Sequence, residues 1–128
     1  MEYYKVVNSS YGSVCAIGKY YNIYGLGKIV EASEGTLGIM VFDSYTYACN
    51  FRNIHGDSDC RILAVEGMRR ATRPKQICMS VKVSIMDEFY DERNSKSFSG
   101  SFNYASTMSP PIGTVCYKKI RVLREVKE

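Results

Sequence analysis

Four cations crowd one short stretch of this sequence and are the side chains best suited to chemistry. The stretch spans seven residues and contains Arg69, Arg70, Arg73 and Lys75. Across residues 61–82, six positive side chains accompany one negative side chain, so this segment alone carries +5, more than the +4 of the whole chain. The planar guanidinium fork matches phosphate and carboxylate groups in a bidentate way. The cluster predicts a loop that binds an anion; the alternative is a solvated loop that balances the acidic residues within 87–92.

Tyrosine is the second unusual feature. The chain has eleven Tyr and five Phe but no Trp, and six of the Tyr fall within the first 24 residues. A tyrosine ring offers a flat apolar face that can stack on a base, and a polar tip that can form a hydrogen bond. Packing within half-buried strands is the other interpretation of these rings. The rings that we expect to stack on a ligand are Tyr20, Tyr21, Tyr24 and Tyr104.

Catalytic and metal-binding patterns are weak in this chain. The one histidine, His55, lies in a polar turn, and neither Ser nor Cys occurs in a nucleophile-elbow pattern. The five cysteines are an odd number without Cys-x-x-Cys spacing, namely Cys15, Cys49, Cys60, Cys78 and Cys116. This spacing favours reduced, structural thiols over a zinc site. We therefore expect binding rather than catalysis, with no catalytic residue, no metal and no cofactor.

Apolar spacing predicts the elements that must position these side chains. Strands are expected over 2–8, 13–17, the end of 20–30, 37–42, 60–66, 77–85 and 115–126. The run over 37–42 is continuously apolar, which is typical of a strand buried on both faces. From Ile77 to Ile85 the apolar residues alternate, which indicates a strand with one face in the core. Residues 67–76 are expected to be irregular, and 115–126 to be a charged edge strand.

One short helix is expected over about 44–53, with Asp43 or Ser44 as its N-cap. Ala48 and its apolar neighbours then recur at helical spacing. Together with the strands, this predicts an α+β fold, a mainly antiparallel sheet of about six strands with the helix packed on it.

The length of 128 residues fits a single domain covering 1–128. Residues 94–111 are rich in Ser and Asn and run up to two prolines, so we expect a mobile or functional loop there. No apolar run approaches the roughly 18 residues that span a bilayer, and the first residues lack a basic or apolar leader. An intracellular protein without a membrane partner is the expectation.

A resemblance covers nearly the whole chain. The segments that carry it are Tyr4-Lys5-Val6-Val7, Gly38-Ile39-Met40-Val41-Phe42-Asp43-Ser44 with Ala48 and Phe51, Ile62-Leu63-Ala64-Val65-Glu66, Gly113-Thr114-Val115 and Arg124-Glu125-Val126. These look like short, uncharacterised proteins of phages and large DNA viruses. The resemblance implies a virus-encoded accessory protein that works in host cytoplasm and counters host defence, by binding a defence protein or by sequestering a nucleotide signal.

A second resemblance covers residues 37–66. An apolar strand that ends in an aromatic, a helix with Ala-x-x-Phe and then Ile-Leu-Ala-Val are similar to the middle of ADP-ribosyltransferase-like domains. The chain departs from that family in the motif that carries the reaction, a His, Tyr and Glu trio in family order. The resemblance implies a related shell, with transferase-like activity as a third possibility for function.

The leading functional prediction is a non-catalytic binding protein that sequesters a nucleotide-type anion, held by the arginines and stacked on tyrosine. An inhibitor that docks on a host defence or nuclease protein is the alternative, because Tyr and Arg also dominate protein interfaces. A homo-oligomer is compatible with both. Nucleic-acid binding is less favoured, because the positive charge does not follow one helix or stripe.

Overall fold

Two long strands, β4 (Arg61–Thr72) and β7 (Thr114–Val126), form the centre of the fold and pair with each other along most of their length. The computed structural model describes residues 2–14, 21–32, 36–74, 77–78, 107–108 and 110–127. The other elements in these ranges are β1 (Glu2–Val7), β2 (Ile29–Glu31), β3 (Ile39–Phe42), α1 (Tyr45–His55), β5 (Ile77–Cys78) and β6 (Thr107–Met108).

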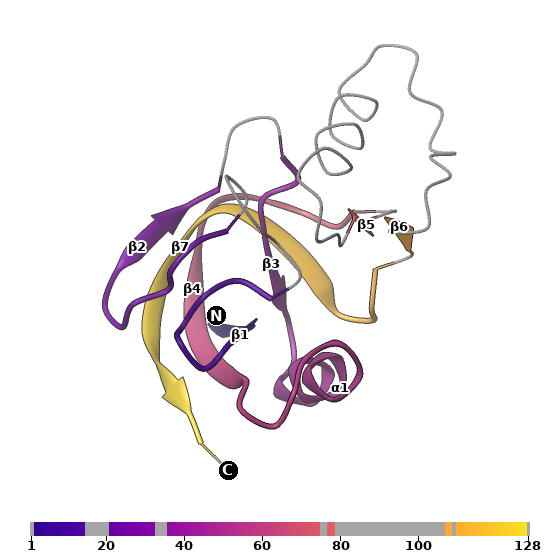
Figure 1. Ribbon diagram of the computed structural model, residues 1–128. Helices are drawn as coiled ribbons and strands as arrows, with labels where there is room; N and C mark the ends of the chain where they lie inside the picture. The colour runs from indigo at the N-terminus through magenta and orange to yellow at the C-terminus, as the bar shows by residue number, and fades with distance from the viewer. Residues whose placement is uncertain are drawn as a thin grey trace.

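Four of the strands close into a small barrel (Figure 1). β1 and β7 each pair with both β3 and β4, which completes the ring. β2 lies outside the ring and pairs with the part of β7 that runs on beyond β3, while β5 and β6 form a separate two-stranded sheet. All of these pairings are antiparallel. The predicted α+β class, with a mainly antiparallel sheet and one short helix among the described residues, is confirmed.

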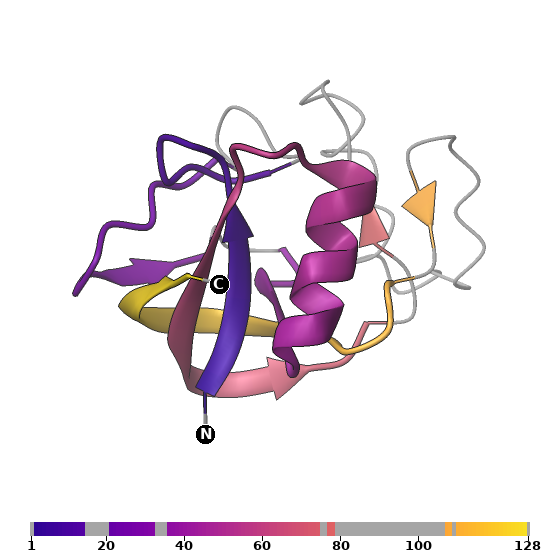
Figure 2. The same ribbon diagram turned by 90° about the horizontal axis from the view of Figure 1, so that it is seen from below.

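Alternation along the strands sorts the apolar side chains into two layers. The barrel interior is filled by Val7, Tyr24, Ile39, Val41, Leu63, Val65, Val115, Tyr117, Ile120 and Val122. The opposite face of β1, β3 and β4 packs against α1 through Val6, Phe42, Ala48, Phe51, Cys60 and Ile62. Figure 2 shows α1 lying along the side of the barrel next to β1. The helix therefore covers one outer face of the barrel, formed by β1, β3 and β4.

The helix agrees closely with its prediction. Ser44 precedes it with extended backbone and accepts a hydrogen bond from the N–H of Ala48, while the Gly56 N–H donates to Arg52 O at the other end. The helix runs two residues further than the predicted 44–53. His55 is consequently its last residue, with its ring centroid 4.9 Å from that of Phe51, and not part of a polar turn as the sequence suggested.

Two glycines make room for one aromatic residue of the barrel. A Cβ at position 67 would overlap the ring of Tyr117, and a Cβ at position 38 would lie 2.7 Å from the backbone oxygen of Tyr117. Gly38 also has a φ of 111°, in a region that side-chain-bearing residues rarely adopt. The sequence therefore uses glycine on both neighbouring strands to seat Tyr117 in the barrel.

Strand β7 differs from its prediction. It is not an edge strand, because β4 pairs with one side of it and β3 and β2 with the other. Its charged side chains point to the outside of the barrel, which the pattern alone could not distinguish from an edge. The pairing with β4 also shifts register twice, so Val115 and Tyr117 face the interior and then Ile120 and Val122 do.

Three other predictions concern short or incompletely described segments. In place of a strand over 13–17, Gly12 and Ser13 form isolated bridges with Ile23 and Val7, and residues 15–20 lie outside the described residues. Of the strand predicted over 77–85, only Ile77–Cys78 can be described. The prediction of a mobile or functional loop over 94–111 likewise lies largely outside the described residues.

Candidate functional site

Two of the predicted anion-binding arginines, Arg69 and Arg70, lie on a strand and not in a loop, and Arg73 directly follows it. β4 continues to Thr72, and its register against β7 shifts between Met68 and Ala71. Met68 pairs with Lys119 and Ala71 pairs with Tyr117, so the backbones of Arg69 and Arg70 lie opposite Lys118. The irregularity lets a segment without regular alternation remain paired, which is why the sequence pattern suggested a loop. We call the group Arg69, Arg70, Arg73 and Lys118 the basic corner.

Arg73 is the residue of the basic corner whose surroundings are best defined. Its side chain is 65% exposed, and its Nη2 lies 3.0 Å from Oδ2 of Asp43, which follows β3. The start of β7 lies between β3 and the end of β4, so this ion pair bridges across β7. Lys118 donates from Nζ to the backbone oxygen of Thr36. An exposed pair of this kind is held weakly, so the guanidinium can exchange Asp43 for another anion at small cost.

Two tyrosines that the sequence analysis did not select lie at the same end of the barrel. Tyr117 is seated between Gly38 and Gly67, and its ring meets that of Tyr3 edge-on at 5.1 Å between centroids. Burial first, and then the interaction with the Tyr3 hydroxyl, raises the pKa of Tyr117 to about 12, against the opposing charge of Arg73. The phenol therefore stays neutral at pH 7 and can donate a hydrogen bond. Gly67, just before the arginines, was the one local signal that a ring approaches here.

Neither Tyr21 nor Tyr24, the two predicted stacking tyrosines that the structure describes, lies at the basic corner. The Tyr24 ring is 2% exposed and belongs to the barrel core, which does not agree with a stacking role. Tyr21 is exposed, but its hydroxyl accepts a hydrogen bond of 3.1 Å from Asn8 Nδ2, at the far end of β1. Tyr20, Tyr104 and Lys75 lie outside the described residues. Arg69 and Arg70 are placed by their backbone alone.

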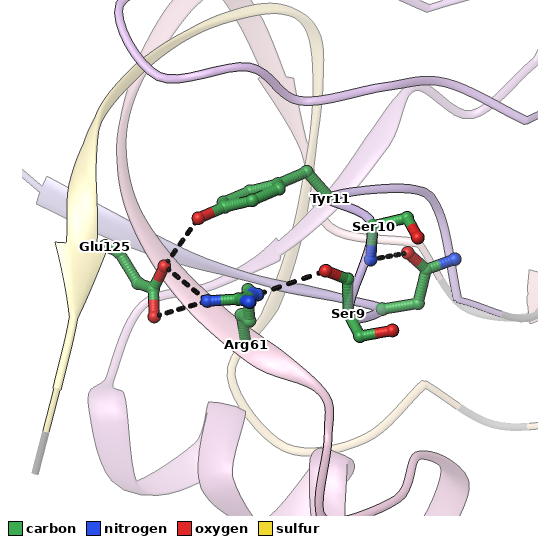
Figure 3. Close-up of polar contacts among 6 residues, drawn as sticks. Ser9, Ser10, Tyr11, Arg61 and Glu125 are labelled. Carbon is green, nitrogen blue, oxygen red and sulfur yellow. Dashed lines mark hydrogen bonds and ion pairs between the residues drawn. The ribbon is translucent and has the colours of Figure 1, made fainter.

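A second polar cluster, built around the single arginine Arg61, lies at the opposite end of β4 (Figure 3). Arg61 donates from Nη1 to both carboxylate oxygens of Glu125, at 3.1 and 3.2 Å, and from Nε to the backbone oxygen of Ser9. Its guanidinium carbon lies 4.8 Å from the ring centroid of Tyr11, whose hydroxyl donates to Glu125 at 2.9 Å. We call Tyr11, Arg61 and Glu125 the arginine latch.

The arginine latch is satisfied within the protein. The hydrogen bond from Tyr11 and the neighbouring Arg61 lower the pKa of Glu125, and the same bond raises the pKa of the Tyr11 hydroxyl. Asn8 Oδ1 accepts the N–H groups of Ser10 and Gly12 and so fixes the turn that presents Tyr11. Tyr11 itself has a φ of 63° in that turn. With so many partners present, the latch joins β1, β4 and β7 and offers no open charge.

The described cysteines and acidic groups do not form a chemical centre. Cys49, Cys60 and Cys116 are not joined in disulfides, and burial raises the pKa of the Cys60 thiol, which lowers its reactivity. Within the described ranges, no three His, Cys, Asp or Glu side chains come together as a metal site would require. The expectation of reduced, structural thiols therefore remains open for Cys15 and Cys78, whose side chains are not described.

Comparison with known proteins adds no relative. No family model, no curated protein and no solved structure matches this chain. None of the helices in the described ranges combines the length and the apolar character needed to cross a membrane.

Proposed function

We propose that this chain is a small, non-catalytic binding protein that captures a nucleotide-type anion at the basic corner. One observation carries the proposal: the register shift in β4 sets two arginines opposite Lys118 of β7, beside the exposed Arg73. The backbones of basic residues from two adjacent strands thus lie opposite each other within a few residues. Asp43 is the carboxylate that the described contacts place on Arg73.

Tyr3 replaces the predicted tyrosines as the ring that we expect to stack on the base. Its ring is partly buried against Tyr117 at the end of the barrel that carries Gly67 and the arginines. A phenol hydroxyl adds a donor for a phosphate oxygen, and a partly exposed ring adds a face for a base. Tyr20 and Tyr104 remain candidates from the sequence.

The biological part of the proposal is sequestration of a host signal. Its support is the sequence resemblance to small proteins of phages and large DNA viruses, together with the weakness of any catalytic pattern. In that setting the protein works in the host cytoplasm and lowers the free concentration of a nucleotide-type messenger.

The test begins with small molecules released by denaturing the purified protein, identified by mass spectrometry, and continues with calorimetric titration of ADP and pyrophosphate. We expect the double reversal Arg70→Glu with Arg73→Glu to lose the released nucleotide. It should also bind ADP at least about 100-fold more weakly, because each charge-assisted contact contributes roughly 1.5–3 kcal/mol. Its melting temperature should change little, since exposed substitutions usually stay within about 0.5 kcal/mol.

A matched control is available on the outside of β7. Arg121→Glu with Lys127→Glu lowers the net charge from +4 to 0, as the corner double does, but leaves the basic corner intact. Retained ADP binding in this control separates a site from a general charge effect. Full binding by the corner double would overturn the anion site and favour the alternative, an inhibitor that docks on a host protein.

A further inference from the structure

One carboxylate oxygen beside the basic corner has no hydrogen-bond partner among the described residues. Asp43 directly follows β3, and its Oδ2 accepts from Nη2 of Arg73 at 3.0 Å, which leaves Oδ1 as an open acceptor. The Asp43 side chain is 26% exposed, so a ligand can approach the carboxylate. An ionised carboxylate accepts hydrogen bonds and donates none. A group that binds to Oδ1 must therefore present a donor.

The turn that leads into β7 positions Oδ1. Asp43 N–H donates to Gly113 O at 3.0 Å, and a Cβ at position 113 would lie 2.8 Å from Oδ1 and 2.4 Å from Cδ2 of Tyr47. The carboxylate therefore packs over the backbone of a glycine, beside the Tyr47 ring. Thr114 fixes the same turn, because its N–H and its hydroxyl both donate to Pro111 O, at 3.2 and 2.6 Å. An acceptor that is already positioned loses little freedom when a ligand binds.

The ring that we expect to stack on a base lies next to this carboxylate. β3 lies between β1 and β7 in the sheet (Figure 1), and its register with β1 opposes Phe42 to Tyr4. Continued by one residue, this register brings Asp43 opposite Tyr3. Residues directly opposite each other in an antiparallel pair have their Cβ atoms about 4.5–5.5 Å apart. A base that stacks on Tyr3 therefore has one edge within reach of the Asp43 carboxylate.

We propose that Asp43 recognises the base of the captured nucleotide and selects guanine over adenine. This inference rests on the proposed function, because it assigns the base to the same site. Guanine presents two adjacent donors on its Watson–Crick edge, N1–H and the N2 amino group. The carboxylate accepts from both, through Oδ1 and through the second lone pair of Oδ2. Arg73 contacts Oδ2 through Nη2, and its other N–H groups can contact a phosphate.

The other bases match this acceptor less well. Adenine and cytosine each present a ring-nitrogen acceptor beside their amino group, and uracil presents its one N–H between two carbonyl oxygens. In each case an acceptor of the base would face an acceptor of Asp43, and both would lack a partner. A polar site rejects such a ligand, because its own polar groups are left unpaired. Since Asp43 is partly exposed, we expect a preference of about tenfold for guanine.

The first experiment varies the ligand and leaves the chain unaltered. Calorimetric titrations with pyrophosphate, ADP, GDP and IDP are compared under the same conditions. We expect GDP to bind about tenfold more tightly than ADP, and IDP to bind with an intermediate affinity, because it keeps N1–H but lacks the N2 amino group. Pyrophosphate has no base and reports the phosphate contacts alone. Folding does not enter this comparison, since no residue is changed.

Asp43→Asn tests the acceptor itself. The amide replaces one oxygen by a donor, which faces the donors of guanine but can pair with the ring nitrogen of adenine. GDP should bind about tenfold more weakly than to the unaltered chain, whereas ADP should not bind more weakly, so the preference is lost. The matched control is Glu31→Gln, which also removes a carboxylate paired with a cation, Lys119 at 3.3 Å. It changes the net charge equally and should keep the preference for GDP.

Three results would overturn the selection of guanine while the anion site remains. The first is equal binding of GDP and ADP by a chain that binds pyrophosphate. The second is IDP binding as tight as that of GDP, and the third is a preference for GDP that Asp43→Asn retains in full. If neither pyrophosphate nor any of the nucleotides binds, the proposed function fails and this inference fails with it. Circular dichroism checks the folding of each variant, and if Asp43→Asn does not fold, the ligand series decides.

Discussion

Arg61 and Arg73 lie at opposite ends of β4, and their surroundings differ sharply. Arg61 has both oxygens of Glu125, a backbone carbonyl and the face of Tyr11 as partners. Arg73, just beyond β4, is more exposed and contacts one oxygen of Asp43, and the backbones of Arg69 and Arg70 nearby lie opposite Lys118. Arginine therefore has two kinds of surroundings at the two ends of β4. The latch fastens strands together, and the role that we propose for the corner is to bind an anion.

This difference shows what distinguishes a structural arginine from a binding arginine. Arginine always carries its charge, so its role is decided by how many acceptors the fold supplies. Where the fold supplies enough acceptors, removing one of them lowers stability. Where it supplies too few, removing the arginine lowers ligand binding and leaves stability almost unchanged.

The largest effect is expected from Gly67→Ala, beside the basic corner. The added Cβ would overlap the Tyr117 ring and push it out of the barrel interior. Overpacking of this kind costs about 2–3 kcal/mol, so the melting temperature should fall by several degrees. The displaced ring also loses its contact with Tyr3, which should weaken ADP binding together with stability. Thermal unfolding and calorimetric titration measure the two effects.

Gly25→Ala is the control for this prediction. Its Cβ would meet only the flexible Lys28 side chain, 3.1 Å away, and the melting temperature should stay close to that of the unaltered chain. If Gly67→Ala melts equally high, the Tyr117 ring moves aside easily. The barrel would then not support the basic corner, and the contrast between the two ends of β4 would lose its structural basis.

The fold was largely predictable because its core follows simple spacing. The apolar run over 37–42 and the helical recurrence around Ala48 led to β3 and α1, and alternation is preserved along β1. One exception was β4 beyond Glu66. A register shift there breaks the period of two, so a paired strand resembled an irregular loop.

The candidate site was predictable only in part, for a different reason. The local density of basic residues, which can be read directly from the sequence, pointed to Arg73. The partners Asp43, Tyr3 and Tyr117 come from three other strands or strand ends, 30 or more residues away. Burial of Tyr24 was equally hidden, because its ring looks the same in the sequence whether it packs in a core or faces solvent. Contacts of this range depend on barrel closure, which local patterns do not report.

An intermediate effect is expected from Glu125→Gln in the arginine latch. The amide keeps one acceptor but loses the charge that holds Arg61 and accepts from Tyr11. Glu125 is 15% exposed and Arg61 37% exposed, so solvent screens part of the interaction and the loss should be about 1 kcal/mol. ADP binding should not change. The control Glu66→Gln, at an exposed position of β4, should leave the melting temperature unaltered.

The same variant should alter the dependence of stability on pH. The pKa of Glu125 is lower in the folded protein than in the unfolded chain, so the unfolded chain binds its proton first. The stabilisation is therefore complete above the ordinary carboxyl pKa and is lost as the pH falls through the lowered folded value. Glu125→Gln should show a shallower loss of stability in acid, while Glu2, whose pKa Arg124 lowers, still contributes to that loss. If the free energy of unfolding falls with decreasing pH as steeply as before, the charge of Glu125 does not contribute to the stability that the latch provides.

The smallest effect on stability is expected from Asp43→Asn, at the other end of the comparison. The exposed ion pair with Arg73 contributes little, so the free energy of unfolding should change by less than about 0.5 kcal/mol. Removing the carboxylate frees the Arg73 guanidinium. It also removes a negative charge that would repel an approaching phosphate. Calorimetric titration with ADP should therefore show binding about twofold to fivefold tighter than for the unaltered chain. The gain should shrink in the double variant Asp43→Asn with Arg73→Gln, because no guanidinium is left to free. Weaker ADP binding by Asp43→Asn alone would mean that Asp43 orients Arg73 for the ligand. Arg73 would then depend on a carboxylate for its position, as Arg61 depends on Glu125 in the latch.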